Sequence, residues 1–213
     1  MTVTIDRTWV ESRFEGRRRI PRDVPMPQAI EAERGDHDLN EGMSPFLPLK
    51  AAAVLIPLIE RPDEITVLFT QRTAHLAHHA GQVSFPGGQI EPGDEGPAST
   101  ALRETEEEVG LERRFVRLIG HLDTYVTRTG FIVTPVVGIV SPPFRFIPDP
   151  FEVAEVFEVP LSFLLDPRNH ERCSACFEGV ERHFYAIRYG RHFIWGATAG
   201  MLMNFCDIVV GRR

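Results

Sequence analysis

Alternating and continuous runs of apolar residues divide most of the chain into predicted strands separated by turn-forming residues. Continuous runs such as 51–59 predict buried strands, while Arg61-Pro62-Asp63 and Arg128-Thr129-Gly130 predict turns. The final segment, 197–209, is apolar on most sides and predicts a buried helix. In chain order, the pattern predicts strands at 51–59, 65–70, 82–85, 115–125, 131–140, 153–159, 184–189 and 192–195, with one helical turn at 161–165.

A different period, with small or apolar residues three or four positions apart, predicts a helix from residue 97 to residue 109. Pro97 suits the first turn of a helix, because its missing N–H would have no partner there. Gly110 suits the left-handed conformation that ends a helix. The stripe expected to be buried consists of Ala98, Ala101, Leu102, Thr105 and Val109.

This order of strands with two main helices predicts a mixed sheet packed between helices, in the α/β or α+β class. Residues 1–47 differ from the rest, because they are polar, rich in proline and without strand alternation. Within them, the segment 28–34 is compatible with a short helix. We therefore predict an N-terminal extension over 1–47 and one folded domain over 48–213, in keeping with a total length of 213 residues.

Composition and charge exclude several classes of protein. The formal net charge is −7, which opposes binding to nucleic acid and to anionic membranes. The longest apolar stretch, 51–59, contains Pro57 and is too short to span a bilayer. No apolar segment typical of a secretory signal follows the N-terminus, and three cysteines do not make a disulfide framework. We therefore expect a cytoplasmic protein.

The spacing of two of the three cysteines allows a metal or redox site as an alternative to an ordinary structural role. Cys173 and Cys176 have the spacing of a zinc or redox pair, but a second such pair is missing. We favour ordinary loop cysteines for these two and a core position for Cys206.

The segment with the most chemical information is the predicted helix that follows Gly87-Gly88. Its carboxylates Glu104, Glu107 and Glu108 are spaced i, i+3 and i+4, so they project from one side of the helix. Like charges so close repel each other unless a cation lies among them, and Mg²⁺ or Mn²⁺ prefers oxygen ligands of this kind. The alternative is a solvated acidic face.

These residues resemble the signature of the Nudix hydrolases. That signature is Gly, five residues, Glu, seven residues, then Arg-Glu, an apolar residue, any residue, Glu-Glu, any residue, Gly and an apolar residue. Residues Arg103 to Leu111 match its second half, with Thr105 at the apolar position, and seven residues separate Glu95 from Arg103. Six residues, rather than five, separate Gly88 from Glu95.

A second stretch resembles the additional motif of one Nudix subgroup, the coenzyme A pyrophosphatases. That motif is Leu-Leu-Thr-any-Arg-Ser/Ala, three residues, Arg, three residues, Gly, three residues, Phe-Pro-Gly-Gly. Here its spacing is kept from Leu68 to Gly88, with Phe69 and Thr73 as mild departures. The serious departure is Ala77, which stands where the motif has its second Arg.

The resemblance implies an α/β/α sandwich and a divalent cation, Mg²⁺ or Mn²⁺. It implies Glu104 and Glu108 as the principal metal ligands and Glu107 as a direct or water-mediated ligand. Arg103 would orient these carboxylates, and Arg72 would contact a substrate phosphate, although a surface salt bridge is its alternative role. The further substrate-binding residues are Phe85, Gly87 and Gly88, and a backbone carbonyl at either glycine is an additional candidate metal ligand.

The resemblance implies a general base either in the Nudix signature itself or in a later loop, where Glu152 and Glu155 are the candidates. Strand alternation would place these two carboxylates on opposite faces, and we favour Glu152, because it is nearer the loop from 142 to 150.

As the resemblance implies, the leading hypothesis is hydrolysis of coenzyme A or its thioesters to 3′,5′-ADP and (acyl-)4′-phosphopantetheine. The alternatives are hydrolysis of another nucleoside diphosphate derivative, such as ADP-ribose or a dinucleotide, and a non-catalytic nucleotide sensor. The expected partner is thus a small molecule. The sequence leaves open the preferred acyl form, the identity of the metal, the role of residues 1–47 and whether two chains form a homodimer.

Overall fold

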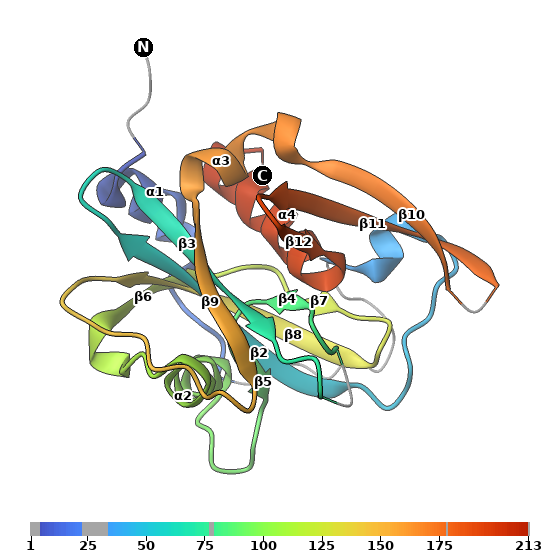
Figure 1. Ribbon diagram of the computed structural model, residues 1–213, viewed down its shortest axis with the longest axis horizontal. Coiled ribbons are helices and arrows are strands. Elements are labelled where there is room, and N and C mark those ends of the chain that lie inside the picture. The colour runs from blue at the N-terminus through green and yellow to red at the C-terminus, as the bar shows by residue number, and fades with distance from the viewer. Residues whose placement is uncertain (1–4, 23–33, 77–78, 178, 213) are drawn as a thin grey trace.

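A computed structural model describes residues 5–22, 34–76, 79–177 and 179–212 (Figure 1). Within these ranges, nine strands form one mixed sheet and three strands form a smaller sheet. The large sheet comprises β1 (Arg34–Gly35), β2 (Lys50–Glu60), β3 (Ile65–Arg72), β4 (Val83–Ser84), β5 (Gly87–Gln89), β6 (Val116–His121), β7 (Tyr125–Val126), β8 (Phe131–Val140) and β9 (Val153–Pro160). The small sheet comprises β10 (Glu171–Phe177), β11 (Val180–Tyr189) and β12 (His192–Trp195).

The centre of the large sheet is the parallel pair of β2 and β8, flanked by β3 and β7 along the order β1-β7-β8-β2-β3-β4. Alternate residues of β2 enter different apolar clusters. Ile56 and Leu58 pack in the cluster that contains helix α4 (Gly196–Val210). Ala53 and Leu55 pack with Ala101 of helix α2 (Pro97–Val109). Burial on both faces explains why 51–59 is continuously apolar.

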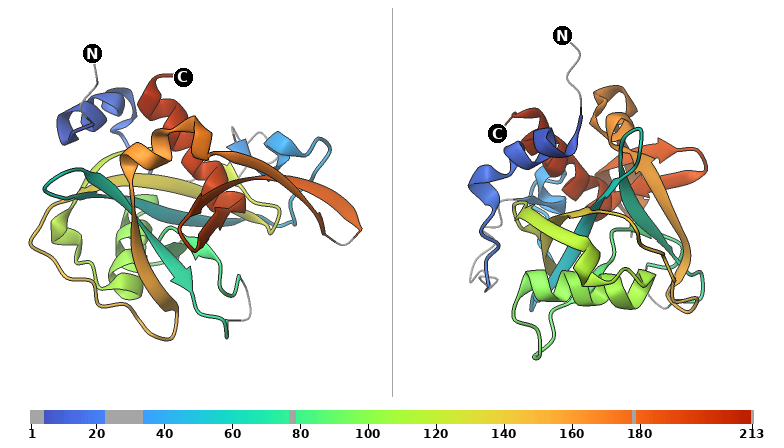
Figure 2. Two further views of the ribbon diagram at one scale, coloured as in Figure 1. Left: turned by 45° about the horizontal axis from the view of Figure 1, so that its top comes forward. Right: turned by 90° about the vertical axis from the view of Figure 1, so that its left-hand side faces the viewer.

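Helices cover both faces of the large sheet. Helix α2 lies on one side, and α4 lies on the other with α1 (Arg7–Arg13) and α3 (Leu161–Leu165) beside it (Figure 2). The predicted sandwich, with a mixed sheet between helices, is therefore confirmed. No helix in the described part of the chain is long and apolar enough to cross a membrane.

The boundaries of α2 agree with the predicted ones. Pro97 is its first residue, and Gly110 ends it with a φ of 67° in the left-handed region. Thr105, which stands at an apolar position of the Nudix signature, is fully buried. Its hydroxyl donates a 2.6 Å hydrogen bond to the carbonyl oxygen of Ala101, so burial leaves no hydroxyl unsatisfied.

Several local predictions were wrong. The segment 115–125 is two strands: β6 pairs with β8 as far as His121, across a register shift between Leu118 and Gly120, and β7 pairs with β8 again only from Tyr125. Cys173 and Cys176 lie in β10, not in a loop. Residues three apart on a strand face opposite sides, so the two thiols do not form one chelating pair. Most of the possible helix at 28–34 lies outside the described residues, and Arg34 belongs to β1.

The described part of the N-terminal segment is packed against the domain. Val10 and Phe14, one helical turn apart, are fully buried, and the Phe14 ring stacks on Phe205 of α4 with centroids 6.1 Å apart. Arg17 donates to the Asp123 carboxylate at 2.6 Å, and Asn204 donates to the same carboxylate at 2.9 Å. Residues 5–22 of the predicted N-terminal extension therefore contribute to the core.

We expect Phe14→Ala to lower the free energy of unfolding by about 3–5 kcal/mol, because it removes a fully buried ring and leaves a cavity. Urea denaturation followed by circular dichroism measures the change. Phe46→Ala is the control, since 57% of this residue is exposed, and it should cost less than about 1 kcal/mol. Equal small effects of both substitutions would mean that the N-terminal segment is not part of the cooperative unit.

Candidate active site

The acidic helix is preceded by a short glycine-containing strand, β5. Strand β5 pairs antiparallel with β2, with Gly88 opposite Ala53 and Gly87 opposite Val54. A Cβ atom on Gly88 would lie 2.4 Å from Oε1 of Glu104. The absence of a side chain at Gly88 therefore lets the Glu104 carboxylate approach the backbone of β5.

Glu108 is the most buried of the predicted carboxylates, with 5% of its surface exposed. Its Oε2 accepts a 3.3 Å hydrogen bond from the Gly87 N–H, and its Oε1 lies 3.7 Å from Nη1 of Arg72. Burial raises the pKa of Glu108 to about 8, despite the opposing effects of Arg72 and the Gly87 N–H. The negative charges of Glu152 and Glu104 add to this rise. The favourable interactions of the Glu108 carboxylate with Arg72 and Gly87 therefore do not offset its burial and the neighbouring negative charges.

Arg103 hydrogen-bonds three carboxylates, and its main partner, Asp94, is not among the predicted site residues. Its Nε and Nη2 donate to the two oxygens of Asp94 at 3.0 and 2.9 Å. Its Nη1 donates to Glu104 at 2.9 Å and to Glu107 at 3.1 Å. The fork of Arg103 holds the pKa of Asp94 well below its usual range.

A spacing signal for Asp94 was present in the sequence. Five residues separate Gly88 from Asp94, as the Nudix signature requires for its first acidic residue, whereas six separate Gly88 from Glu95. Glu95 is exposed. The longer loop therefore places an aspartate, with its shorter side chain, beside Arg103.

The three predicted metal ligands are not equivalent. Glu107 has 60% of its side chain exposed and is bound to Arg103, and no group of three acidic, His or Cys side chains in the described residues already forms a metal site. Partial burial raises the pKa of Glu104, and Glu107 and Glu152 add to the rise while Arg103 opposes it. The pair Glu104 and Glu108 thus suits a cation such as Mg²⁺, which binds proteins through one or two carboxylates and keeps several waters.

The two general-base candidates are in different surroundings. Glu155 lies in β9, where its carboxylate accepts from Arg191 at 2.6 Å and lies 3.3 Å from His192. Glu152 lies in the turn before β9, and its backbone carbonyl accepts from the Thr73 N–H at 3.0 Å. The alternation argument was wrong for Glu152, because it is not in the strand, but its charge does act on Glu104 and Glu108.

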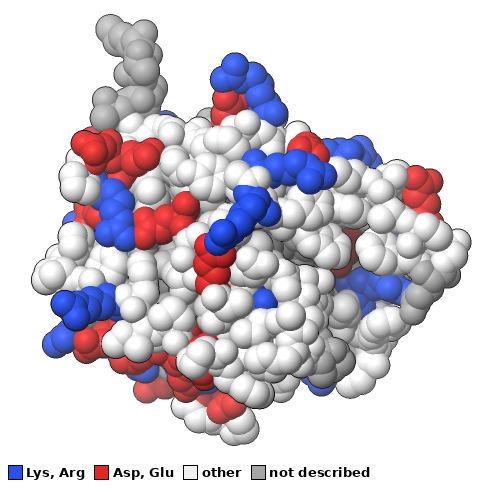
Figure 3. All heavy atoms as spheres, viewed as in Figure 1, with Lys and Arg blue, Asp and Glu red and all other residues white. Residues whose placement is uncertain are grey.

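A cleft of about 540 Å³ opens at Gly87 and Gly88; Glu108 and Glu104 adjoin these two glycines but do not themselves line the cleft. Arg72, Gly87 and Gly88 line it near Glu108, as does Phe85, whose ring is 2% exposed and stacks on Phe69. Phe85 therefore serves core packing as well as the cleft wall. Acidic atoms gather along the lower edge of the molecule, where α2 lies (Figure 3). Ala77, the departure from the subgroup motif, lies outside the described residues.

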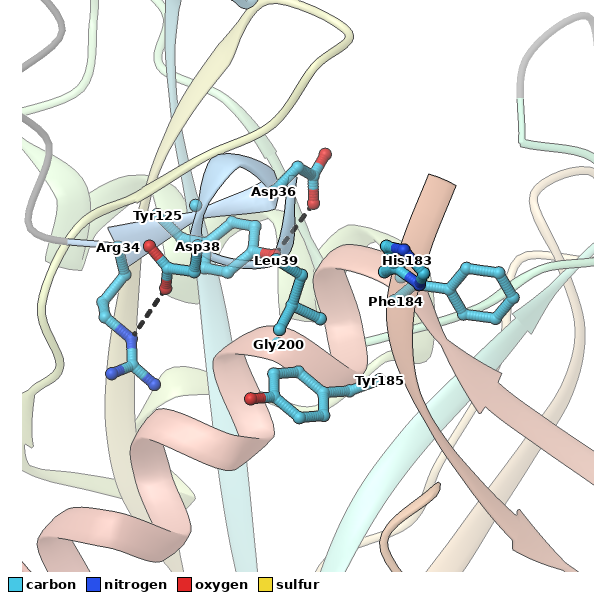
Figure 4. Close-up of a pocket in the computed structure, with 11 residues that line it drawn as sticks. Arg34, Asp36, Asp38, Leu39, Tyr125, His183, Phe184, Tyr185 and Gly200 are labelled. Atoms are coloured by element: carbon cyan, nitrogen blue, oxygen red, sulfur yellow. Dashed lines mark hydrogen bonds and ion pairs between the residues drawn. The ribbon is translucent and has the colours of Figure 1, made fainter. Parts of the chain in front are cut away.

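A second cavity, between the turn that contains Asp36 and helix α4, measures only about 20 Å³ (Figure 4). The Tyr125 hydroxyl donates to Asp36 at 2.8 Å, and Arg34 pairs with Asp38 at 3.2 Å. This volume accommodates about one water molecule, so the cavity is too small for a nucleotide.

Comparisons with known proteins agree with the motif. A NUDIX domain model matches residues 49–173. Nudix hydrolase NudL of Photorhabdus laumondii subsp. laumondii, described as uncharacterized, is 42% identical over 158 residues, which are 74% of this chain and 84% of that protein. A protein of the same description from Yersinia pseudotuberculosis serotype O:1b is 42% identical over 160 residues, covering 75% of this chain and 80% of that protein.

A solved structure, the MutT/nudix family protein from Enterococcus faecalis, has a TM-score of 0.53 at 18% identity and covers 79% of this chain and 64% of its own. This likeness supports the fold. Nudix hydrolases are pyrophosphohydrolases that cleave phosphorus-containing acid anhydrides, and they generally require divalent metal ions. The domain match over more than half of the chain and the identity to the NudL proteins show that this chain belongs to the Nudix hydrolase family.

Proposed function

We propose that the enzyme hydrolyses the pyrophosphate bond of coenzyme A or its thioesters, giving 3′,5′-ADP and (acyl-)4′-phosphopantetheine. The observation that carries this proposal is the convergence of two separate motifs on one cleft. Arg72, Gly87 and Gly88 come from the stretch that resembles the coenzyme A motif, and Arg72 lies 3.7 Å from Glu108 of the Nudix signature. A cleft of about 540 Å³ is in the range of small-molecule sites.

Glu104 and Glu108 would hold the divalent cation, Mg²⁺ or Mn²⁺, with Glu107 reaching it through a water and a carbonyl of Gly87 or Gly88 as a further ligand. A cation held there neutralises phosphate oxygens and makes a water more acidic. It would also supply the positive charge that the buried Glu108 lacks in its protein surroundings.

The protein's own groups then position substrate and water. The Nε of Arg72 is buried and has no hydrogen-bond partner among the described residues, so it is available to donate to a phosphate oxygen of the substrate. Glu152, on the same side as Glu104 and Glu108, would accept the proton of the attacking water. Arg103 acts as a positioning residue, because its guanidinium group holds the carboxylates of Glu104 and Glu107. Asp94 in turn holds the guanidinium group of Arg103 in place.

A second candidate is hydrolysis of ADP-ribose or a dinucleotide, which Ala77 favours because the subgroup motif has Arg there. A non-catalytic sensor is disfavoured, because the Arg-Glu…Glu-Glu set of the signature is nearly intact, with Arg103 bonded to Glu104 and Glu107.

A substrate panel tests the proposal. With Mg²⁺ or Mn²⁺, we expect kcat/KM for coenzyme A or acetyl-coenzyme A to exceed that for ADP-ribose by at least about tenfold, because binding contacts to both ends of the substrate contribute. Mass spectrometry identifies the bond that is cleaved from the products. No turnover of coenzyme A at saturating metal, with ADP-ribose cleaved, would establish the second candidate instead.

Glu108→Gln should reduce kcat by at least about 10²–10³-fold, because the amide keeps the shape but cannot provide the charge that a cation requires. The fold should survive, since a poorly compensated buried charge is removed. Glu106→Gln is the matched control on the same helix: Glu106 pairs with Arg113 at 3.3 Å, away from the cleft, and its loss should leave kcat unchanged. Wild-type turnover in Glu108→Gln would refute the ligand assignment.

Asp94→Asn should lower activity and also change how stability depends on pH. Arg103 depresses the pKa of Asp94, so the ionised pair stabilises the fold above about pH 4, and this contribution disappears as pH falls through the folded-state pKa. Thermal melts should therefore show a loss of about 1.5–3 kcal/mol at pH 7 that shrinks towards pH 2. The neighbouring exposed residue supplies the control, Glu95→Gln. If Glu95→Gln has the larger effect, Asp94 is not the partner on which Arg103 depends.

A further inference from the structure

The cleft has a second wall, formed by the small sheet. Arg182, Phe184 and Ala186 alternate along β11 and so share one face, and Trp195 of β12 pairs with Ala186 on the same face. The Phe184 and Trp195 rings meet edge to face with centroids 5.3 Å apart. Phe177 of β10 lies parallel to Trp195 with centroids 6.4 Å apart. We call Phe177, Phe184 and Trp195 the aromatic wall; all three line the cleft that contains Gly87 and Gly88.

Arg182 lines the cleft beside the aromatic wall. Its Nε is buried and has no hydrogen-bond partner in the described residues, and no ion pair with a described acidic residue is formed. By contrast, Arg188, six residues further along β11, already has partners. It forms an ion pair with Glu171 at 3.3 Å, and its guanidinium carbon lies 4.4 Å from the centroid of the Phe193 ring. A buried donor without a partner is costly, and an anion bound in the cleft would satisfy it.

The strand that carries Arg182 is fixed to the body of the domain. Asn40, which is 8% exposed, accepts from the His183 N–H at 2.9 Å and donates to the His183 carbonyl at 2.9 Å. A third bond joins the Asn40 amide to the Asp36 carbonyl at 2.8 Å. His183 lies between Arg182 and Phe184 in the chain. The hydrogen bonds of Asn40 therefore fix the backbone at Arg182 and Phe184 before a ligand binds.

We infer that this wall is the nucleotide subsite, in which the adenine base stacks on the aromatic wall and Arg182 binds a phosphate on the ribose. The inference rests on the proposed function and deepens it by naming the feature of the substrate that is recognised. Arg72 lies 3.7 Å from Glu108, whereas Arg182 lines the cleft on β11 with the aromatic wall, so Arg182 is available for a phosphate other than the one that is cleaved.

The chemistry of the wall separates the two ends of the substrate. Stacking on an aromatic side chain requires a flat π system, and a guanidinium selects an anion, often with two parallel hydrogen bonds. Pantetheine is flexible, uncharged and without a ring, whereas an adenosine with a 3′-phosphate provides both features. Arg182 and Trp195 also lie beyond residues 49–173 matched by the NUDIX domain model, so this subsite would be an addition to the shared catalytic domain.

Kinetics with two substrates provide the first test. Arg182→Gln should lower kcat/KM for coenzyme A by about 10–100-fold, the loss of a charge-assisted hydrogen bond, through a rise in KM with kcat kept. It should leave kcat/KM for dephospho-coenzyme A, which lacks the 3′-phosphate, within about twofold. Arg188→Gln is the control and should change neither value. An equal loss on both substrates would overturn the assignment.

Binding without metal provides a test that does not depend on turnover. The chain has two tryptophans, so Trp9→Phe leaves Trp195 as the only indole, and its fluorescence reports stacking of a nucleotide. In EDTA, 3′,5′-ADP should quench it with a Kd at least about tenfold lower than 5′-AMP, and Arg182→Gln should abolish this difference. If Arg182→Gln does not fold, Arg182→Lys should retain part of the difference, because the charge remains but the fork is lost.

The outcomes for the two proposals are distinguishable. Preference for 3′,5′-ADP without cleavage of coenzyme A would retain the subsite and reject the proposed reaction. Cleavage of coenzyme A with equal binding of 3′,5′-ADP and 5′-AMP would reject the subsite and retain the reaction.

Discussion

Burial of the Glu108 carboxylate sets the conditions for the rest of the site. Glu108 precedes the fully buried Val109 in α2, so packing the helix onto β2 brings this carboxylate to the edge of the core with 5% of its surface exposed. In that position it has one backbone N–H at 3.3 Å and one guanidinium at 3.7 Å as favourable partners. Its raised pKa expresses the imbalance, and binding a divalent cation is the simplest way to correct it.

The same turn of helix also positions the loop that carries Glu152. At the end of α2, the carbonyls of Glu108 and Val109 accept the backbone N–H groups of Asp149 and Ile147 at 2.9 and 2.8 Å. These carbonyls would otherwise be unsatisfied, as at every helix C-terminus. The same hydrogen bonds thus end the helix and fix the loop that leads to Glu152. The position of this loop does not require a sequence motif within the loop itself.

The sequence predicted the features that depend on local pattern. The apolar runs located β2, β8 and the sandwich, and helical spacing with Pro97 and Gly110 gave both ends of α2. It could not predict features that depend on tertiary pairing. Gly87–Gln89 forms β5 only because β2 offers a partner edge. For Asp94 the spacing from Gly88 was a usable signal, but its contact with Arg103 depends on the course of a loop, which periodicity does not describe. The segment around α1 is anchored by the buried Val10 and Phe14, with Ile5 and Trp9 partly buried beside the core, and so few apolar residues do not give a recognisable stripe.

The residues of the catalytic site and those that line the rest of the cleft come from different parts of the chain. The acidic pair, Arg103 and Arg72 lie within the matched NUDIX domain, residues 49–173, and in our proposal they act on the phosphate linkage of the substrate. Other residues that line the cleft come from β11 and β12 and, through Asn40, from the segment before residue 48. The hydrogen bonds between Asn40 and His183 join these two parts of the chain. If the proposed nucleotide subsite lies there, substrate preference can change on β11 and β12 while the charge balance around Glu108 stays the same.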